Sequence, residues 1–171
     1  VTRPKERAGT LSDKLRVLGA DVWEYPCIET VPIRPCPSMA AALDHIADYE
    51  WLVFTSPAGV SAFRTELKRM GKDGRYLAAV KLGAIGTGTA KALGEMGLGA
   101  DFLPTVYDAE HLGRELPAAG KVLILRAEIG SPALTETLEQ RGIPYDDIPV
   151  YRTVYQNAAS QALRQALEAG E

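Results

Sequence analysis

The chain has 171 residues, of which 46% are hydrophobic and 24% charged, as is usual for a globular protein. Its net charge of -3 gives no basic field for nucleic acid and no polybasic segment for an anionic membrane. The longest apolar runs are strand-sized and too short to span a bilayer. We therefore expect a cytoplasmic protein that binds neither nucleic acid nor membrane. The first residue is Val1, no signal-peptide pattern follows it, and we expect the natural N-terminus to lie upstream.

In chain order, short apolar runs alternate with segments of helical periodicity. Strands are predicted at 1–2, 21–25, 51–54, 80–85, 100–103, 121–125 and 145–150. Helices are predicted around Leu11, Leu15 and Leu18, which are spaced i, i+4 and i+7, and at 57–70, 87–97 and 108–116. Strands that alternate with helices of this length indicate an α/β fold with a parallel sheet and helices on both faces.

The two ends of this pattern repeat each other at one constant offset, without a gap. The identical pairs are Arg3/Arg126, Leu11/Leu134, Leu15/Leu138, Gly19/Gly142, Pro26/Pro149, Thr30/Thr153 and Val31/Val154. Each copy reads as a strand that ends at an arginine, then a polar turn, a helix with a glycine at its C-cap, and a second strand. Because the identities follow the same structural order, internal duplication explains them better than chance.

The repeat also predicts how the chain is divided. Residues 36–150 hold five strands with their helices, enough for a complete domain, whereas 1–35 with 151–171 hold too few elements to close a core. We predict two similar flavodoxin-like domains, one inserted in the other, with the first incomplete in this chain. The chain would cross between them at 30–35 and return at 150–155 as a two-stranded antiparallel linker. The cleft between the domains is then the expected ligand site.

The segment FTSPAGVSAF (54–63) places Thr55 and Ser56 where a strand ends and a helix begins. Either hydroxyl can cap the helix, and Pro57 suits its first turn. Such a turn can be only a cap, or it can also bind an anion, because the first N–H groups of a helix are unpaired and carry partial positive charge. Ligands of open α/β sheets bind at this edge, so Thr55, Ser56 and Gly59 are candidate anion-binding residues.

A second candidate turn is GAIGTGTAKAL (83–93), which also follows a strand and opens a helix. It is similar to a dinucleotide-binding fingerprint, but Lys91 occupies the third glycine position, and FLPTVYD stands where an acidic strand end is required. A turn that offers backbone N–H groups to a carboxylate fits better, with Gly86, Thr87 and Gly88 as the binding residues.

Three further side chains are candidates by position. Arg3 and Arg126 occupy equivalent strand ends, and each can equally be a surface residue. Tyr151 lies in the second crossing segment, where it can pack as a hinge aromatic or direct its hydroxyl into the cleft; the second interpretation is favoured because the cleft is the expected ligand site. Cys27 and Cys36 fit neither a zinc knuckle nor a redox pair, and His45 and His111 lack metal-ligand spacing. We therefore predict no metal and no cofactor, and expect an anionic ligand.

The chain resembles the uroporphyrinogen-III synthase family over nearly its whole length. The resemblance rests on an ordered set of segments: VTRP, LGADVWEYPCIETVPI, WLVFTSPAGVSAF, AIGTGTAKAL, FLPTVYDAEHL and VLILRAEIG, followed by VYRTV. It implies two similar α/β domains joined by a two-stranded ladder, in a monomeric enzyme of heme and porphyrin biosynthesis.

The resemblance also implies the reaction, in which the linear tetrapyrrole hydroxymethylbilane is cyclised to uroporphyrinogen III with inversion of ring D. No metal or cofactor takes part, and orientation of the substrate is the main task of such an enzyme. The eight substrate carboxylates would be held at the turns beginning at Ser56 and Gly86. Tyr151 matches the tyrosine of the family's V-Y-[RQ]-T segment and is the expected proton donor to the departing hydroxyl.

Two expectations complete this hypothesis. The strand and Thr-Ser turn of residues 51–56 should recur beyond Glu171, so the chain is expected to be cut short. The deaminase that makes the substrate is an expected partner.

The alternatives are a non-catalytic flavodoxin-like domain that binds anions or regulates, and a dinucleotide enzyme. A receiver-type domain would need acidic strand ends, where this chain has Arg3, Thr55 and Arg126.

Overall fold

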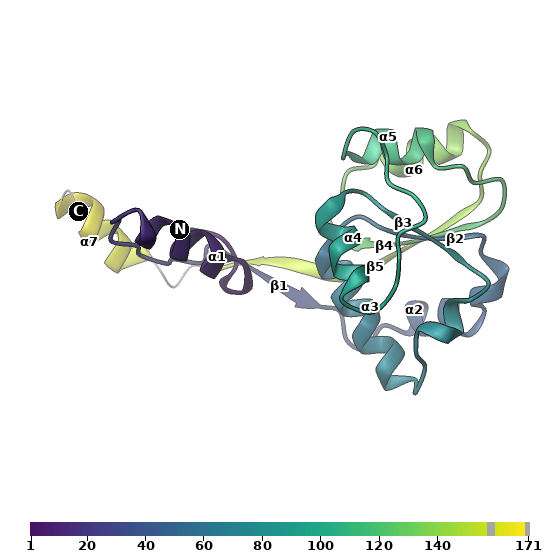
Figure 1. Cartoon of the computed structure of the whole chain (residues 1–171), viewed down its shortest axis with the longest axis horizontal. Helices are drawn as coiled ribbons and strands as arrows, with labels where there is room; N and C mark the ends of the chain where they lie inside the picture. The colour runs from purple at the N-terminus through teal and green to yellow at the C-terminus, as the bar shows by residue number, and fades with distance from the viewer. Residues whose placement is uncertain (157–159, 170–171) are drawn as a thin grey trace. The chain divides into compact units, whose positions relative to one another are not determined.

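The computed structural model describes residues 1–156 and 160–169 (Figure 1). Helices and strands alternate along the chain. Their bounds are α1 Lys5–Val17, β1 Ile28–Pro32, α2 Pro37–Asp44, β2 Trp51–Phe54, α3 Pro57–Arg69, β3 Lys81–Ala84, α4 Thr87–Gly94, α5 Ala109–Glu115, β4 Val122–Ala127, α6 Ala133–Gln140, β5 Tyr145–Tyr155 and α7 Ser160–Ala169. Two short 3₁₀ helices, η1 Ile46–Asp48 and η2 Gly74–Leu77, precede β2 and β3. In this part of the chain, no helix is both long enough and apolar enough to cross a membrane.

The chain forms two compact units. The terminal unit consists of Val1–Val31 and Thr153–Glu171, and the central unit is the continuous segment Pro32–Arg152.

The strands form one sheet in the order β1-β5-β4-β2-β3. β2 pairs in parallel with both β3 and β4, and β4 pairs in parallel with β5, as the alternation of strands and helices predicted. Next to β5, β1 runs antiparallel: the N–H of Ile33 donates to the carbonyl of Val150, and that of Gln156 donates to Cys27. Segments 30–35 and 150–155 thus pair in the predicted direction.

The sheet differs from two expectations: its strand order is not flavodoxin-like, and most of the strand predicted at 100–103 is missing. A flavodoxin-like sheet would place its third strand beside its first. Here β2 pairs directly with β4, and Phe102 lies beyond β3, so the strands of the central unit follow the order 3-2-1-4-5 of a doubly wound sheet. The strand predicted at 100–103 shrinks to a single parallel bridge between Gly83 and Phe102. The Asp101 carboxylate accepts the N–H of Leu82 at 2.7 Å, which removes a donor from the backbone ladder.

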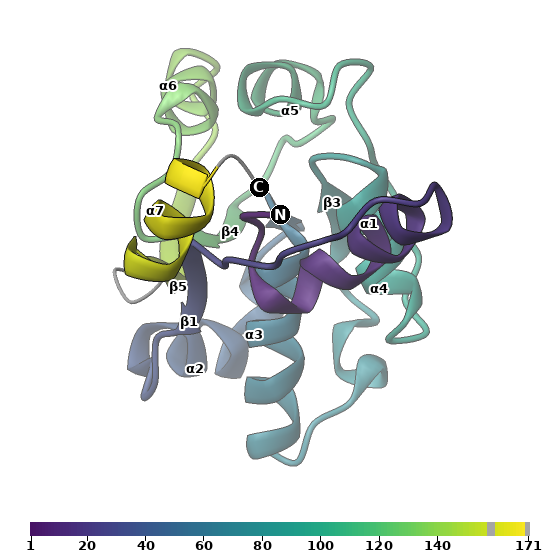
Figure 2. The same cartoon turned by 90° about the vertical axis from the view of Figure 1, so that its left-hand side faces the viewer.

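Helices cover both faces of the parallel strands, because both faces of β2 and β4 are apolar. Leu52 and Phe54 of β2 face a core that includes residues of α2, α3 and α4, whereas Trp51 and Val53 face the core formed with α5 and α6. Figure 2 shows these two helical layers on opposite sides of the sheet. All four side chains are at most 2% exposed, so this three-layer core fixes where the strands end.

The internal repeat is visible in the structure. α1 ends at Val17 and α6 at Gln140, which are equivalent positions, and each helix is followed by a glycine with positive φ, 85° at Gly19 and 67° at Gly142. The hydrogen bonds that close the two helices are also equivalent. The N–H groups of Gly19 and Ala20 donate to Arg16 and Leu15, and those of Gly142 and Ile143 donate to Glu139 and Leu138.

The first copy lacks the predicted strands at 1–2 and 21–25, because neither segment has a strand assignment. The pairing is nevertheless present: the amino group of Val1 donates to the carbonyl of Trp23 at 2.6 Å, and the N–H of Tyr25 donates to Val1 at 2.9 Å. This is the equivalent of the parallel pairing of Ile124 with Asp147 in the second copy.

Candidate functional site

The carboxyl ends of β2, β3 and β4 meet at one edge of the central unit. Phe54, the last residue of β2, is aligned with Ala84 at the end of β3 and with Leu125 near the end of β4. Because the chain leaves β2 toward β3 and later returns to the other side of β2 as β4, the strand order reverses between β2 and β4. Open α/β sheets bind ligands at such a reversal, beyond the carboxyl ends of the strands.

The first turn at this edge begins α3. Ser56 is extended, with φ −164° and ψ 156°, and its hydroxyl accepts the N–H of Gly59 at 3.1 Å, which confirms the predicted cap. A Cβ added at Gly59 would lie 3.0 Å from the carbonyl oxygen of Leu125, so glycine is required for α3 to approach β4. The N–H of Gly59 therefore belongs to the cap. Among the described residues, the N–H of Ala58 has no acceptor.

The second turn begins α4, with Gly86 as its N-cap. The N–H groups of Thr89 and Ala90 donate to the carbonyl of Gly86, each at 3.0 Å. Those of Thr87 and Gly88 have no acceptor within the residues the structure describes, and both residues are exposed. Unpaired N–H groups at a helix N-terminus attract anions.

The two helix N-termini are neighbours. A Cβ added at Gly88 would lie 4.0 Å from Cγ of Pro57, which is van der Waals contact. The unpaired N–H groups of Ala58, Thr87 and Gly88 are thus gathered at one edge, and we call these three residues the amide edge. Thr55 is half-buried beside it, between β2 and the Ser56 cap.

Arg126, at the end of β4, has its guanidinium engaged within the protein. Its Nε donates to Asp147 at 2.8 Å, its Nη2 donates to the same carboxylate, and its Nη1 donates to the carbonyl of Ser131 at 2.6 Å. The side chain is 15% exposed. Arg126 therefore holds the loop that follows β4, and its predicted role in ligand binding stays a prediction. Its equivalent in the repeat, Arg3, is exposed in the terminal unit.

Tyr151 lies beside the end of β4. It is aligned with Ala127, and its carbonyl accepts the N–H of Glu128 at 2.8 Å. The ring is half-buried and packs against the core that contains residues of α2 and α3. Its hydroxyl forms no hydrogen bond with any residue that the structure describes. Its predicted role as a proton donor stays a prediction.

The sequence interpretation missed two exposed side chains at this edge, Tyr107 before α5 and Ile129 after β4. Tyr107 is 57% exposed and Ile129 is 89% exposed. The sequence signal for both residues is their position in a loop that follows a strand. For Tyr107 this signal could have been used, because its segment FLPTVYD comes soon after the glycine turn.

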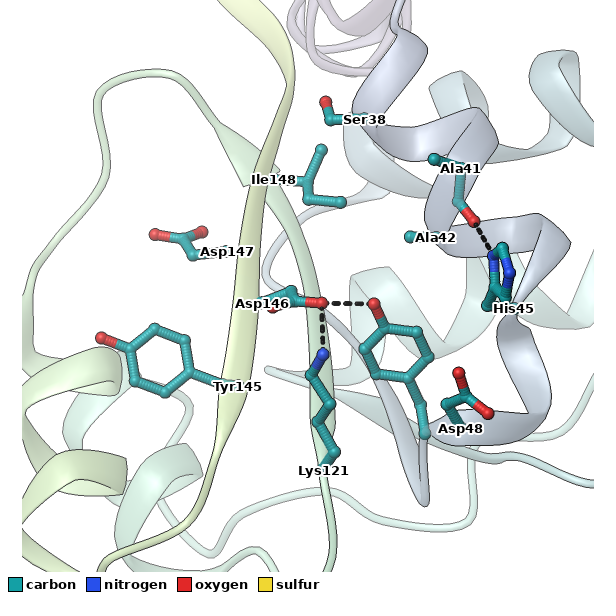
Figure 3. Close-up of a pocket in the computed structure, with 11 residues that line it drawn as sticks. Ser38, Ala41, Ala42, His45, Asp48, Lys121, Tyr145, Asp146, Asp147 and Ile148 are labelled. Atoms are coloured by element: carbon teal, nitrogen blue, oxygen red, sulfur yellow. Dashed lines mark hydrogen bonds and ion pairs between the residues drawn. The ribbon is translucent and has the colours of Figure 1, made fainter.

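A separate hollow of about 630 Å³ lies at the opposite ends of the strands (Figure 3). There the Asp146 carboxylate accepts from the hydroxyl of Tyr49 and lies 2.8 Å from Nζ of Lys121. Lys121 and Tyr49 hold the pKa of Asp146 below its usual value, whereas burial and the Asp146 carboxylate raise the pKa of Tyr49. These three groups satisfy one another, which indicates a structural network. In the described parts of the chain, no group of side chains is suited to hold a metal ion.

Comparison with known proteins decides the family. The family model described as "Uroporphyrinogen-III synthase HemD" matches residues 9–171. The chain belongs to the uroporphyrinogen-III synthase family. This confirms the resemblance inferred from its sequence segments.

Relatives in this family are longer than the chain. A "Porphyrin biosynthesis protein HemD" of Ruminiclostridium josui is 42% identical over 175 residues, which cover 100% of this chain and 35% of that protein. A uroporphyrinogen-III synthase of Synechococcus elongatus is 29% identical over 156 residues, covering 89% of this chain and 59% of the relative. The chain thus spans less than two thirds of the length of either relative.

Solved structures of the family have the same fold. A mutant uroporphyrinogen III synthase from the extremely thermophilic bacterium Thermus thermophilus gives a TM-score of 0.70 at 24% identity, covering 97% of this chain and 66% of that chain. A wild-type crystal form of the same synthase gives 0.60 at 26% identity, covering 99% and 66%.

Proposed function

We propose that this chain provides one half of the active site of a uroporphyrinogen-III synthase. The substrate would be hydroxymethylbilane, a linear tetrapyrrole with eight carboxylates, and the deaminase that makes it would be the supplying enzyme. The observation that carries the proposal is the amide edge: an acidic chain presents three adjacent unpaired N–H groups at the edge where α/β sheets bind ligands. Family membership supplies the substrate class.

The amide edge would bind substrate carboxylates. Ala58 offers one N–H from α3, and Thr87 and Gly88 offer two from α4. Backbone donors are fixed by the helices, so they orient the substrate without losing side-chain entropy. Because uncatalysed closure gives the isomer without inversion, orientation would determine which product forms. Arg126 contributes by holding the loop after β4 against Asp147.

Tyr151 would act as the proton donor. Its hydroxyl would protonate the terminal hydroxyl of the substrate, which leaves as water and gives an azafulvene in its protonated, cationic form. The substituted carbon of ring D then attacks the freed methylene carbon and forms a spiro intermediate. The bond from that carbon to the methylene bridge of the neighbouring pyrrole breaks, and the other α-carbon of ring D attacks this bridge, which inverts the ring. The proton that this α-carbon loses balances the one donated. The free hydroxyl of Tyr151 beside the end of β4 supports this role.

We also propose that the terminal unit belongs to a second domain built like the central unit, with the boundaries near 35 and 151. The support is the repeat, including equivalent helix ends and the pairing of Val1 with the segment around Glu24.

Incubation of the complete protein, with both of its domains, with hydroxymethylbilane, followed by separation of the product isomers, tests the function. We expect isomer III, whereas a sample without protein should give isomer I. Isomer I alone, from a folded protein, would contradict the proposal. A dinucleotide titration monitored by fluorescence separates the alternative, because binding of NAD(P) or flavin is not expected.

A further inference from the structure

The most unusual contact at the amide edge is between an exposed aromatic ring and a glycine. A Cβ added at Gly86 would lie 3.1 Å from Cγ and 3.3 Å from Cδ2 of Tyr107. Gly86 has φ −176° and ψ 177°, an extended conformation that any residue can adopt. Glycine is therefore needed here for the approach of the ring and not for the backbone. The ring of Tyr107 rests on the N-cap of α4 while 57% of the residue stays exposed.

The loop that carries Tyr107 is fixed from both sides. The N–H and the hydroxyl of Thr105 donate to the carboxylate of Glu115, at 2.7 and 2.6 Å. Asp108 caps α5 by accepting the N–H of His111 at 2.8 Å, and its own N–H donates to Val106 at 2.9 Å. These bonds hold the loop without help from the Tyr107 side chain. The ring is thus presented rigidly, and its exposed surface is not explained by packing.

The unpaired backbone donors next to the ring indicate what it would contact. The unpaired N–H groups of Thr87 and Gly88 immediately follow the glycine on which it rests. A ligand with a carboxylate at those donors and an aromatic ring joined to it would place that ring next to Tyr107. Each pyrrole of a bilane carries its carboxylates on short side chains, so it has this combination. Stacked or edge-to-face aromatic pairs stabilise a complex beyond the area that they bury.

We propose that Tyr107 is a substrate-binding residue whose ring contacts one pyrrole of the bilane while the N–H groups of Thr87 and Gly88 bind a carboxylate of the same pyrrole. This inference rests on the proposed function and adds a contact that orients one ring. Gly86 serves it indirectly, because it lets the Tyr107 ring reach this position.

The test compares four variants of the full-length protein: Tyr107→Ala, Tyr107→Phe, Gly86→Ala and the double variant. Two readouts are needed, the KM and kcat for hydroxymethylbilane, and the Kd for uroporphyrin, the oxidised and fluorescent form of the product. Tyr107→Ala should raise KM and Kd about three- to tenfold and change kcat less than twofold. Tyr107→Phe keeps the ring and should stay within about twofold of wild type. Val106→Ala, in the same loop, is the matched control and should also stay within about twofold.

Gly86→Ala displaces the ring and should weaken binding as Tyr107→Ala does. In the double variant, Gly86→Ala should weaken binding little beyond the effect of Tyr107→Ala, because the ring is already absent. Wild-type affinity of Tyr107→Ala, equal losses in Val106→Ala, or a loss in Tyr107→Phe as large as in Tyr107→Ala would each overturn the proposal. Failure of the proposed function is a different result, since wild-type protein would then make no isomer III. If such protein still bound uroporphyrin through Tyr107, the contact would stand without the catalysis. Absence of both activity and binding would overturn the two together.

Discussion

One backbone N–H of the amide edge can be removed by a proline substitution that leaves the fold and the other proposed binding groups unchanged. Thr87 is the first residue of α4, a position where proline is favoured because its missing N–H has no partner within the helix. The preceding Gly86 is extended, as the residue before a proline should be. α3 already has Pro57 at the same position. Thr87→Pro should therefore fold normally and lose one donor.

The expected loss follows from the geometry. A hydrogen bond to a charged group contributes about 1.5–3 kcal/mol, and because Thr87 is exposed we take the lower end. A loss of about 1.5 kcal/mol corresponds to a roughly tenfold rise in Kd. The assay is a fluorescence titration with uroporphyrin, together with the KM for hydroxymethylbilane and a thermal melt. Thr87→Ala, which removes the side chain and keeps the N–H, is the control and should stay within about twofold. Wild-type affinity of Thr87→Pro, or equal loss in Thr87→Ala, would refute the backbone-donor argument.

Three further predictions concern single side chains. Tyr151→Phe should lower kcat by roughly 10²–10⁴ and shift the isomer ratio less, in a turnover assay; unchanged turnover would confine the tyrosine to packing. Gly59→Ala should destabilise the protein by about 1–3 kcal/mol in urea unfolding because its Cβ would meet β4, whereas Gly94→Ala, where the Cβ meets nothing within 4 Å, should not destabilise it. Asp146→Asn should cost about 1 kcal/mol at pH 7, a value discounted because the Asp146 side chain is 42% exposed. Because the pKa of Asp146 is lowered, its contribution to stability is complete above the ordinary carboxyl pKa and is lost as pH falls through the lowered value. The free energies of unfolding of the variant and the wild type should therefore become equal in acid. A difference between them that does not change with pH would contradict this prediction.

Local signals predicted much of the candidate site. Ser56 followed by Pro57 is a complete helix start, and the structure has that cap. The alternation of apolar runs predicted the parallel strands, because burial on both faces leaves little other choice for runs of this length. The repeat predicted equivalent glycines after α1 and α6, and both helices close with equivalent hydrogen bonds.

Contacts between distant segments could not be predicted in this way. Arg126 looked like a free strand-end arginine, but Asp147 and the carbonyl of Ser131 occupy its donors, and these partners come from the next loop and strand. The contact of Tyr107 with Gly86 depends on how two loops meet in space. The strand order was misjudged for the same reason, since local periodicity does not determine which strand pairs with which.

An NMR titration of the ¹⁵N-labelled protein with uroporphyrin would identify the backbone N–H groups that bind the ligand. We expect the amide signals of Ala58, Thr87 and Gly88 to shift first and furthest, because these N–H groups would bind the carboxylates. The amide signals of Tyr49, Lys121 and Asp146 should not shift, because these residues lie around the hollow at the opposite ends of the strands. Shifts confined to that hollow, or no shift at the three amides when the ligand is bound, would show that the amide edge is not the binding site.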